Sequence, residues 1–301
     1  MITKMITQYP EFTKLSIDLK PEIKQITSSY APYSDFDFTS LFCWDTNDST
    51  GVSLLNQNLV IRLPDYLTGE TVISILGEHL MDESITKLLS DGHSLHLIPE
   101  ISVAALKHPD LFIVTEDRDN FDYIYELKAL VDLSGKKYKL KRNKANNFMR
   151  SYEESLDLKK IRFGVSDDLL LAKEVFMKWA KERQRSPLDI DNEYTAIARA
   201  LDFASQLNLM GVLVYINDLC VGFSINEIID EKYAICHFQK AILEYEHLDV
   251  FISNLVAKEL FHYGCTYVNW EQDLGIEGLR QLKSSYQNYG YLKKYTVETR
   301  A

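Results

Sequence analysis

Three consecutive strand-like runs in the second half of the chain restrict the fold more than any other feature. Residues 210–216, 220–228 and 233–242 are rich in β-branched and aromatic side chains. The pairs Asn217-Asp218 and Asp230-Glu231 separate them, and both pairs are typical turn formers. Because strands joined by such short turns pair with each other, the sequence predicts an antiparallel meander here.

The elements around this meander extend the prediction to a whole domain. Amphipathic helices are predicted over residues 169–183 and 194–207, and a long helix over 248–263 follows the meander. A strand over 266–270, a helix over 276–285 and a last strand over 291–297 complete the chain. This order resembles that of the Gcn5-related acyltransferase fold, and residues 16–115 give a rougher version of it. The predicted fold class is therefore α/β (α+β), with two tandem acyltransferase-like domains, each a mixed sheet flanked by helices.

A basic stretch separates the two patterns. Residues 134–150 contain seven Lys and Arg and no acidic residue, within a chain of 301 residues and net charge −11. Helical spacing places Tyr138, Ala145, Phe148 and Tyr152 on one stripe and Lys137, Lys141 and Lys144 on another. We therefore predict an N-terminal domain over 1–133, a basic connecting helix over 134–155 and a C-terminal domain over 156–301. The cationic stripe either binds a polyanion or is a solvated face paired with acidic protein surface.

Composition sets limits on the protein class. A hydrophobic content of 46% is sufficient for two packed domains, and the net charge of −11 argues against broad, non-specific binding of nucleic acid. The four cysteines are scattered without a CxxC pair, which indicates buried thiols rather than a zinc site or disulfides. No apolar run is long enough for a transmembrane helix, and no signal peptide is recognisable. We expect a cytoplasmic protein.

Residues 269–286, NWEQDLGIEGLRQLKSSY, form the densest polar cluster. Two carboxylates, Glu271 and Asp273, follow the predicted strand, and Arg280 and Lys283 share a face of the next helix. Ligands of open α/β sheets bind at the carboxyl ends of strands, and a carboxylate there can act as a general base. A capped turn with solvated charges is the alternative interpretation.

Two long segments resemble a known family. YIYELKALVDLSGKKYKLKRNKANNFMRSY and the 269–286 segment resemble the signatures of an uncharacterised bacterial family related to the C-terminal catalytic domain of phosphatidylglycerol lysyltransferase. The resemblance spans essentially the whole chain. It implies tandem acyltransferase folds similar to those of Fem-type transferases, which move amino acids from aminoacyl-tRNA.

The resemblance also singles out positions on the meander. Glu227 lies in its second strand, and His237 and Lys240 lie in the HFQKA segment of its third strand. Strand alternation predicts that His237 and Gln239 share one face and Lys240 the other, unless a bulge intervenes. His237 taken alone is more often a satisfied core histidine than a functional one.

Together these patterns predict a site, with Glu271, Asp273, Arg280, Lys283 and Tyr286 lining one cleft. The resemblance and the spacing indicate no metal site. The predicted roles are as follows: catalytic, Glu271, Asp273, Lys283 and Tyr286; substrate-binding, Glu227, His237, Lys240, Asn269 and Arg280; polyanion-binding, Lys137, Lys141, Arg142 and Lys144.

We expect no cofactor at this site. Conventional acetyltransferases hold the pyrophosphate of acetyl-CoA with a glycine-rich loop before the long helix, whereas residues 242–249 here have no glycine and three carboxylates. The leading hypothesis is an aminoacyltransferase that uses aminoacyl-tRNA, bound through the basic helix, and a small-molecule or lipid-headgroup acceptor. A non-catalytic module that binds a small ligand or nucleotide is the alternative, and acylation from CoA is disfavoured.

Overall fold

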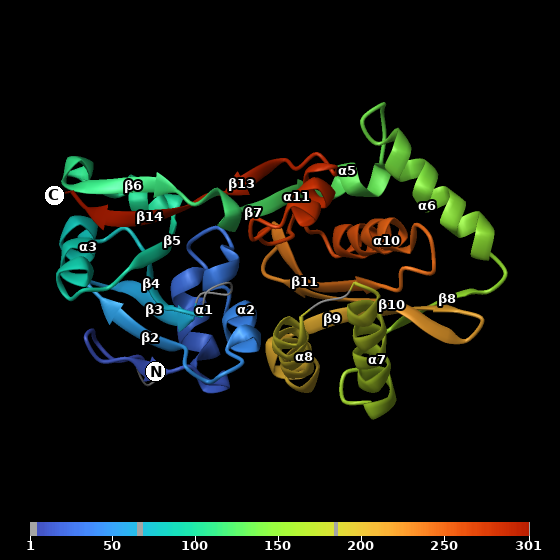
Figure 1. Cartoon of the computed structure of the whole chain (residues 1–301), viewed down its shortest axis with the longest axis horizontal. Helices are drawn as coiled ribbons and strands as arrows, with labels where there is room; N and C mark the ends of the chain where they lie inside the picture. The colour runs from blue at the N-terminus through green and yellow to red at the C-terminus, as the bar shows by residue number, and fades with distance from the viewer. Residues whose placement is uncertain (1–4, 65–68, 184–185, 301) are drawn as a thin grey trace. The chain divides into compact units, whose positions relative to one another are not determined.

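The chain forms two compact α/β units in the computed structural model, which describes residues 5–64, 69–183 and 186–300 (Figure 1). Unit 1 contains the chain up to Tyr123, then Gln272–Leu282 and the chain from Tyr291 onward. Unit 2 contains Ile124–Glu271 and Lys283–Gly290. Each unit has a mixed sheet flanked by helices, so the predicted fold class is confirmed.

The sheet of unit 1 has the order β1-β2-β3-β4-β5-β14-β6. Only β4 and β5 pair in parallel, and all other neighbours are antiparallel. Asn56 and Gln57 join β2 to β3 with positive φ angles of 50° and 70°, as a tight two-residue hairpin requires. The strands are β1 Thr13–Lys14, β2 Gly51–Leu55, β3 Asn58–Pro64, β4 Thr71–Leu76, β5 Leu95–Pro99, β6 Phe112–Glu116 and β14 Lys294–Thr299.

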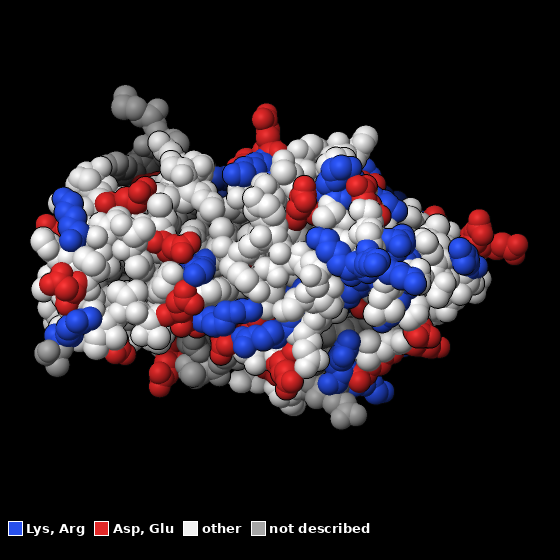
Figure 2. All heavy atoms as spheres, turned by 90° about the horizontal axis from the view of Figure 1, so that it is seen from above, with Lys and Arg blue, Asp and Glu red and all other residues white. Residues whose placement is uncertain are grey.

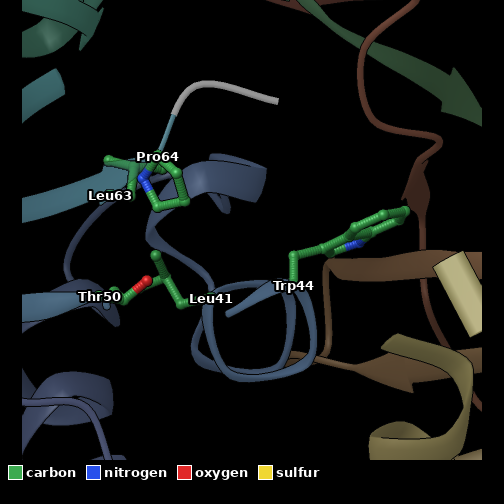
Figure 3. A pocket seen from close by; sticks show the side chains of 5 residues that line it. All are labelled: Leu41, Trp44, Thr50, Leu63 and Pro64. Carbon is green, nitrogen blue, oxygen red and sulfur yellow. The ribbon is translucent and has the colours of Figure 1, made fainter. Parts of the chain in front are cut away.

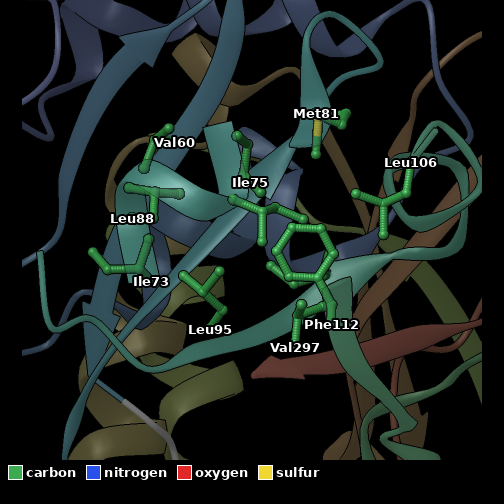
Figure 4. Close-up of a cluster of buried hydrophobic side chains, with 11 residues drawn as sticks. Val60, Ile73, Ile75, Met81, Leu88, Leu95, Leu106, Phe112 and Val297 are labelled. Atoms are coloured by element: carbon green, nitrogen blue, oxygen red, sulfur yellow. The ribbon is translucent and has the colours of Figure 1, made fainter. Parts of the chain in front are cut away.

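A hydrophobic cluster joins this sheet to helix α3 (Figure 4). Apolar residues recur on one face of α3, and they pack on alternate side chains of the central strands. The helices of this unit are α1 Lys20–Thr27, α2 Phe38–Trp44, α3 Met81–Ser90 and α4 Glu100–Ala104. The buried members of the cluster are Val60, Ile73, Ile75, Met81, Ile85, Leu88, Leu95, Ile98, Leu106, Phe112 and Val297.

Strand β14 is held in unit 1 by a buried ion cluster. The Lys294 side chain is fully buried, and its Nζ lies 2.8 Å from Asp122 Oδ1 and close to Asp35 Oδ2. Ser34 Oγ also accepts a hydrogen bond from Lys294 at 3.1 Å. Because a buried ammonium is stable only with such partners, these contacts tie the C-terminal strand to residues near the N-terminus.

The sheet of unit 2, which includes a few residues of unit 1 in β7 and β13, has the order β13-β7-β12-β11-β10-β9-β8. The meander β9-β10-β11 is antiparallel, as predicted, and β12 adds in parallel to β11. The strands are β7 Asp122–Glu126, β8 Leu156–Lys160, β9 Leu209–Ile216, β10 Leu219–Ile228, β11 Tyr233–Ala241, β12 Tyr267–Asn269 and β13 Gly290–Leu292.

Helices cover both faces of this sheet (Figure 1). Gln239 of β11 bonds to Ser253 of α10, whereas Lys240 contacts Trp179 of α7 and Glu193 of α8, so α10 lies on one face and α7 and α8 on the other. No helix in the described part of the chain is both long and apolar enough to span a bilayer. The remaining helices are α5 Leu127–Asp132, α6 Lys139–Tyr152, α7 Ser166–Glu182, α8 Pro187–Asp202, α9 Ala204–Leu207, α10 Leu248–His262 and α11 Glu277–Ser284.

Strands β11 and β12 pair over only three residues. Tyr233–Ile235 is in register with Tyr267–Asn269, after which β12 ends and β11 continues to Ala241. The pairing of β11 with β10 also shifts register beside Ile225 and Asn226, which marks a β-bulge at His237. The sheet is therefore open beside His237, at the carboxyl end of β12, where ligands of such sheets bind.

Two expectations about the elements differ from the structure. The last strand, expected over 291–297, is two strands, and β14 inserts between β5 and β6 of the first sheet. Each compact unit is consequently built from separate stretches of the chain, which do not follow the expected boundaries at 133 and 156. In α6 the buried stripe contains Ala145 and Phe148 as predicted, but it also contains Lys141, which was expected on the exposed stripe.

The packing of α10 on the meander leaves no space at Gly222. A Cβ there would lie 2.5 Å from Ile252 Cδ1 and 3.1 Å from the Lys240 carbonyl oxygen. We expect Gly222→Ala to lower the free energy of unfolding by about 1–3 kcal/mol in urea denaturation. The matched control is Gly278→Ala in α11, where nothing lies within 4 Å, and it should raise stability by about 0.5–1 kcal/mol. A neutral Gly222→Ala would contradict this packing.

Candidate active site in unit 2

His237 lies between two glutamates at the opening in the sheet. Its Nε2 is 3.5 Å from Glu227 Oε2, and its Nδ1 is 3.3 Å from Glu271 Oε1. The side chains of His237 and Glu227 are 2% exposed, whereas that of Glu271 is 18% exposed. Glu271 is thus the member of the group that solvent or a substrate reaches, and the histidine connects it to a second, buried carboxylate.

The bulge determines which side of the sheet each neighbour of His237 faces. Gln239 points to α10, but His237 meets Glu227, which by register shares the α7 and α8 face with Lys240. The expectation that His237 and Gln239 share a face applied to a regular strand, and the bulge removes it. Lys240 is engaged elsewhere on that face, 2.7 Å from Glu193 and 4.2 Å from the centre of the Trp179 ring.

Glu271 reaches His237 from a sharp corner after β12. Its φ is +56°, in the left-handed region that non-glycine residues seldom adopt. The Asn269 side chain stabilises this corner, because its Oδ1 accepts a hydrogen bond from the Glu271 N–H at 2.6 Å. Lys283 Nζ donates to the Trp270 carbonyl oxygen at 2.5 Å from the other side. Asn269 and Lys283 therefore shape the corner, which we call the 270–271 corner.

An aromatic cluster packs against the 270–271 corner. The ring of Trp270 lies 4.3 Å from that of Tyr125 and 4.9 Å from that of Tyr286, measured between centroids. The Tyr125 hydroxyl donates to the Lys283 carbonyl oxygen at 2.8 Å, and the Tyr138 hydroxyl donates to the Tyr286 carbonyl oxygen at 3.0 Å. Burial raises the pKa of Tyr286, so its hydroxyl is protonated at neutral pH. The sequence pattern indicated Tyr286, but it gave no signal for Tyr125, which lies 158 residues from Lys283.

Asp273 belongs to a different group, in unit 1. Both its oxygens bond to Arg280, at 2.7 and 2.9 Å. The Tyr123 hydroxyl donates at 2.7 Å, Arg118 at 3.2 Å and the Gly275 N–H at 2.9 Å. These five hydrogen bonds occupy the carboxylate, so little acceptor capacity is left for a substrate proton.

The electrostatics of Asp273 agree with a structural ion-pair network. Burial alone would raise the pKa of the Asp273 carboxyl, but hydrogen bonds from Arg280 and Tyr123 outweigh burial and lower it. Arg280 also pairs with Asp119 at 2.6 Å, and the pKa of its guanidinium is raised by these two carboxylates. The five residues expected in one cleft thus divide between Asp273 with Arg280 in unit 1 and Glu271, Lys283 and Tyr286 in unit 2.

The cations of the basic stretch have separate environments. Lys137 is exposed and Lys144 is half-buried, whereas Lys141 is 9% exposed. Arg142 Nη1 donates to the Leu133 carbonyl oxygen just after α5, where it caps the helix. Figure 2 shows Lys and Arg gathered over α5, the turn before α6 and the start of α6. Within residues 134–150 the exposed cations are Lys136, Lys137 and Lys139, which form this basic surface, and Arg150 near the end of α6.

Two hollows have linings that do not include His237, Glu227 or Glu271. A cavity of about 10 Å³ in unit 1 is lined by Leu41, Trp44, Thr50, Leu63 and Pro64, and Figure 3 shows the Trp44 indole turned away from the rest. This cavity holds at most one water molecule. A surface hollow of about 480 Å³ in unit 2 is lined by Asn147, Phe148, Arg150, Ser151, Tyr152, Glu246 and His247.

The role of Asp273 as an ion-pair centre can be tested by Asp273→Asn. We expect a loss of about 3 kcal/mol in the free energy of unfolding at pH 7, because two guanidinium groups lose their shared partner. A carboxyl whose native pKa is lowered contributes stability above its unfolded pKa, so the difference should shrink below about pH 4. Denaturation at several pH values measures both effects.

Asp119→Asn is the matched control, because Asp119 contacts the same Arg280 but is 54% exposed. It should cost no more than about 1 kcal/mol. Equal losses for the two variants would contradict the central position of Asp273.

Comparison with known proteins identifies the family of the chain. Residues 29–298 match the model of the C-terminal region of phosphatidylglycerol lysyltransferase. An uncharacterized protein of Mycoplasmoides gallisepticum is 27% identical in an alignment of 201 residues that covers 63% of this chain. The match spans 59% of that relative's length, less than two thirds.

Solved structures share the fold over almost the full chain. A conserved protein of unknown function from Bacteroides thetaiotaomicron is 26% identical, with a TM-score of 0.83 over 96% of this chain and 99% of that one. L-PGS from Bacillus licheniformis is 13% identical, with a TM-score of 0.61 over 99% and 95%. FemX is 9% identical, with a TM-score of 0.60 over 95% and 96%.

At these identities L-PGS and FemX show a common fold only. The family model covers most of the sequence, including both signature segments. The chain therefore belongs to the family of the phosphatidylglycerol lysyltransferase C-terminal domain, as those segments predicted.

Proposed function

We propose that the protein is an aminoacyltransferase that moves an amino acid from aminoacyl-tRNA to an amine or hydroxyl acceptor, with its chemistry in unit 2. The observation that carries this proposal is the Glu227–His237–Glu271 group at the opening between β11 and β12. Membership of a lysyltransferase family supports the reaction type and makes lysyl-tRNA the first donor to test.

The group supplies what acyl transfer to an amine needs. The acceptor nitrogen attacks the ester carbonyl carbon, a C–N bond forms, and the bond from that carbon to the tRNA ribose oxygen breaks. Glu271 accepts the proton that the nitrogen loses, and His237 beside it can take up that proton and return it to the departing oxygen. Glu227, 3.5 Å from the other ring nitrogen, stabilises the charged form of the imidazole.

The other predicted site residues support this arrangement in different ways. Asn269 and Lys283 hold the 270–271 corner, and Tyr286 packs on it. In this proposal Asp273 and Arg280 stabilise unit 1, and Lys240 stabilises the helical face, so none of the three touches substrate. A small molecule or a lipid headgroup is the acceptor.

Acetyl-CoA has no part in the proposal. The segment before α10 lacks glycine, and its Glu244 is 3.1 Å from Lys178 of α7 while the side chain of Glu246 is 87% exposed. Carboxylates so close to the start of α10 disfavour a pyrophosphate there.

Glu271→Gln tests the proposal. The purified protein is incubated with radiolabelled lysyl-tRNA and, in separate reactions, phosphatidylglycerol vesicles and small amines, and labelled product is counted. Wild type should form product, and Glu271→Gln should form it at least about 100-fold more slowly, as expected for loss of a general base. The exposed Glu246→Gln is the matched control and should be unaffected. Wild type that binds lysyl-tRNA but transfers to no acceptor would overturn the proposal in favour of a binding module.

The basic surface provides a second test, of the donor. We expect tRNA binding at low salt, with an affinity that falls steeply as salt rises. The double variant Lys137→Gln, Lys139→Gln should reduce the slope of log affinity against log salt by about 2, because each lysine neutralises about one phosphate. Lys87→Gln, an exposed lysine of unit 1, is the control. Wild type without salt-sensitive tRNA binding would exclude this surface as an RNA site.

A further inference from the structure

Lys141 is a buried ammonium with an unusual partner. It lies on the inner stripe of α6 with Ala145 and Phe148, and it is 9% exposed. Its Nζ is 3.6 Å from the centre of the Tyr286 ring. In the described part of the chain, no carboxylate oxygen lies within 4.0 Å of Nζ, and no acceptor takes a hydrogen bond from it. The aromatic ring is therefore its main source of compensation for lost water.

A chain of contacts leads from this ammonium to the 270–271 corner. Tyr286 packs edge-on against Trp270, with 4.9 Å between ring centres. The Trp270 carbonyl oxygen accepts a hydrogen bond from Lys283. The next residue, Glu271, has a left-handed backbone conformation, and its carboxylate lies beside His237. The residue before α6 contacts Tyr286 as well, because the Tyr138 hydroxyl donates to the Tyr286 carbonyl oxygen.

We propose that Lys141 is a positioning residue: its ammonium fixes Tyr286 against Trp270 and thereby holds the corner that presents Glu271 to His237. The functional meaning of the corner rests on the proposed function, but the mechanical coupling does not. A left-handed, non-glycine corner persists only when its surroundings over-determine it, and Lys141 is one of those surroundings.

The charge on Lys141 is sensitive to pH in a useful range. Burial lowers the pKa of Lys141 to about 8, opposed by Asp249 of α10 and assisted by Lys144 of α6. Tyr286 faces it with a protonated hydroxyl, since burial raises the pKa of that group. Raising the pH through 8 should remove the charge and loosen the corner.

Global stability should change in the opposite direction. An unfolded lysine titrates near 10.4, so between pH 8 and 10 the unfolded chain binds more protons than the native one. For Lys141 alone, stability therefore rises with pH over this interval. A residue that merely stabilised the fold would not loosen one corner while the protein as a whole became more stable.

Amide hydrogen exchange measured by mass spectrometry on residues 269–272 tests the coupling. Rates at pH 7 and 9 are divided by the intrinsic exchange rate at each pH. Lys141→Met keeps the stem and removes the charge, and it should speed exchange at the corner about tenfold at pH 7 without lowering the melting temperature. Lys141→Arg keeps a cation at both pH values and should protect the corner at both. Wild type should resemble Lys141→Arg at pH 7 and move toward Lys141→Met at pH 9.

Lys144→Met, one turn away on α6, is the matched control and should leave the corner unchanged. Unchanged exchange in Lys141→Met would overturn the proposal, as would faster exchange throughout unit 2 with a lower melting temperature. If Lys141→Met does not fold, the pH dependence of wild type compared with Lys141→Arg still decides. Because no turnover is measured, a failed transfer assay and a failed coupling are separate results.

Discussion

The early end of pairing between β11 and β12 is the constraint on which the site depends. Three parallel pairs bring the strands together, and then β12 ends while β11 runs on with a bulge at His237. A fourth and fifth pair would fill this space with backbone hydrogen bonds and leave His237 as an ordinary strand residue. The opening instead lets Glu271 approach the imidazole from one side, while Glu227 on the next strand approaches from the other.

Such a corner has an energetic cost that the surroundings must offset. A non-glycine residue in the left-handed region is disfavoured by about 1–2 kcal/mol. The burial of the Lys283 ammonium beside it adds a desolvation penalty. The side chain of Asn269, the ammonium of Lys283 and the ring of Tyr286 are the groups that over-determine the geometry. Several buried polar groups thus stabilise one strained backbone conformation. Such strain is characteristic of functional sites, where it is retained because it places a reactive group.

Sequence patterns predicted the regular elements well and the long-range contacts poorly, for a physical reason. The meander and helices α7 and α10 follow from local periodicity and turn chemistry, which act within about ten residues. The insertion of β14 beside β5 depends on Lys294 meeting Asp35 and Asp122, 172 or more residues away, and no local pattern encodes it. The division of Asp273 and Glu271 into two groups is of the same kind, because Arg118 and Tyr123 claim Asp273 from 150 residues or more away.

The basic stretch shows most clearly why charge in a sequence does not translate directly into a binding surface. Arg142 donates a hydrogen bond to a carbonyl oxygen at the end of α5, and Lys141 is buried against the ring of Tyr286. Of the seven cations, Lys136, Lys137, Lys139 and Arg150 are exposed, so an RNA or another polyanion would meet a smaller positive surface than seven cations suggest. The buried Lys141 also connects α6 to the site, because its ammonium contacts Tyr286, which packs on the corner that carries Glu271. A polyanion bound to the outer lysines would bring negative charge near Lys144 and Lys141. That charge would raise the pKa of Lys141 and so favour the protonated lysine that contacts Tyr286.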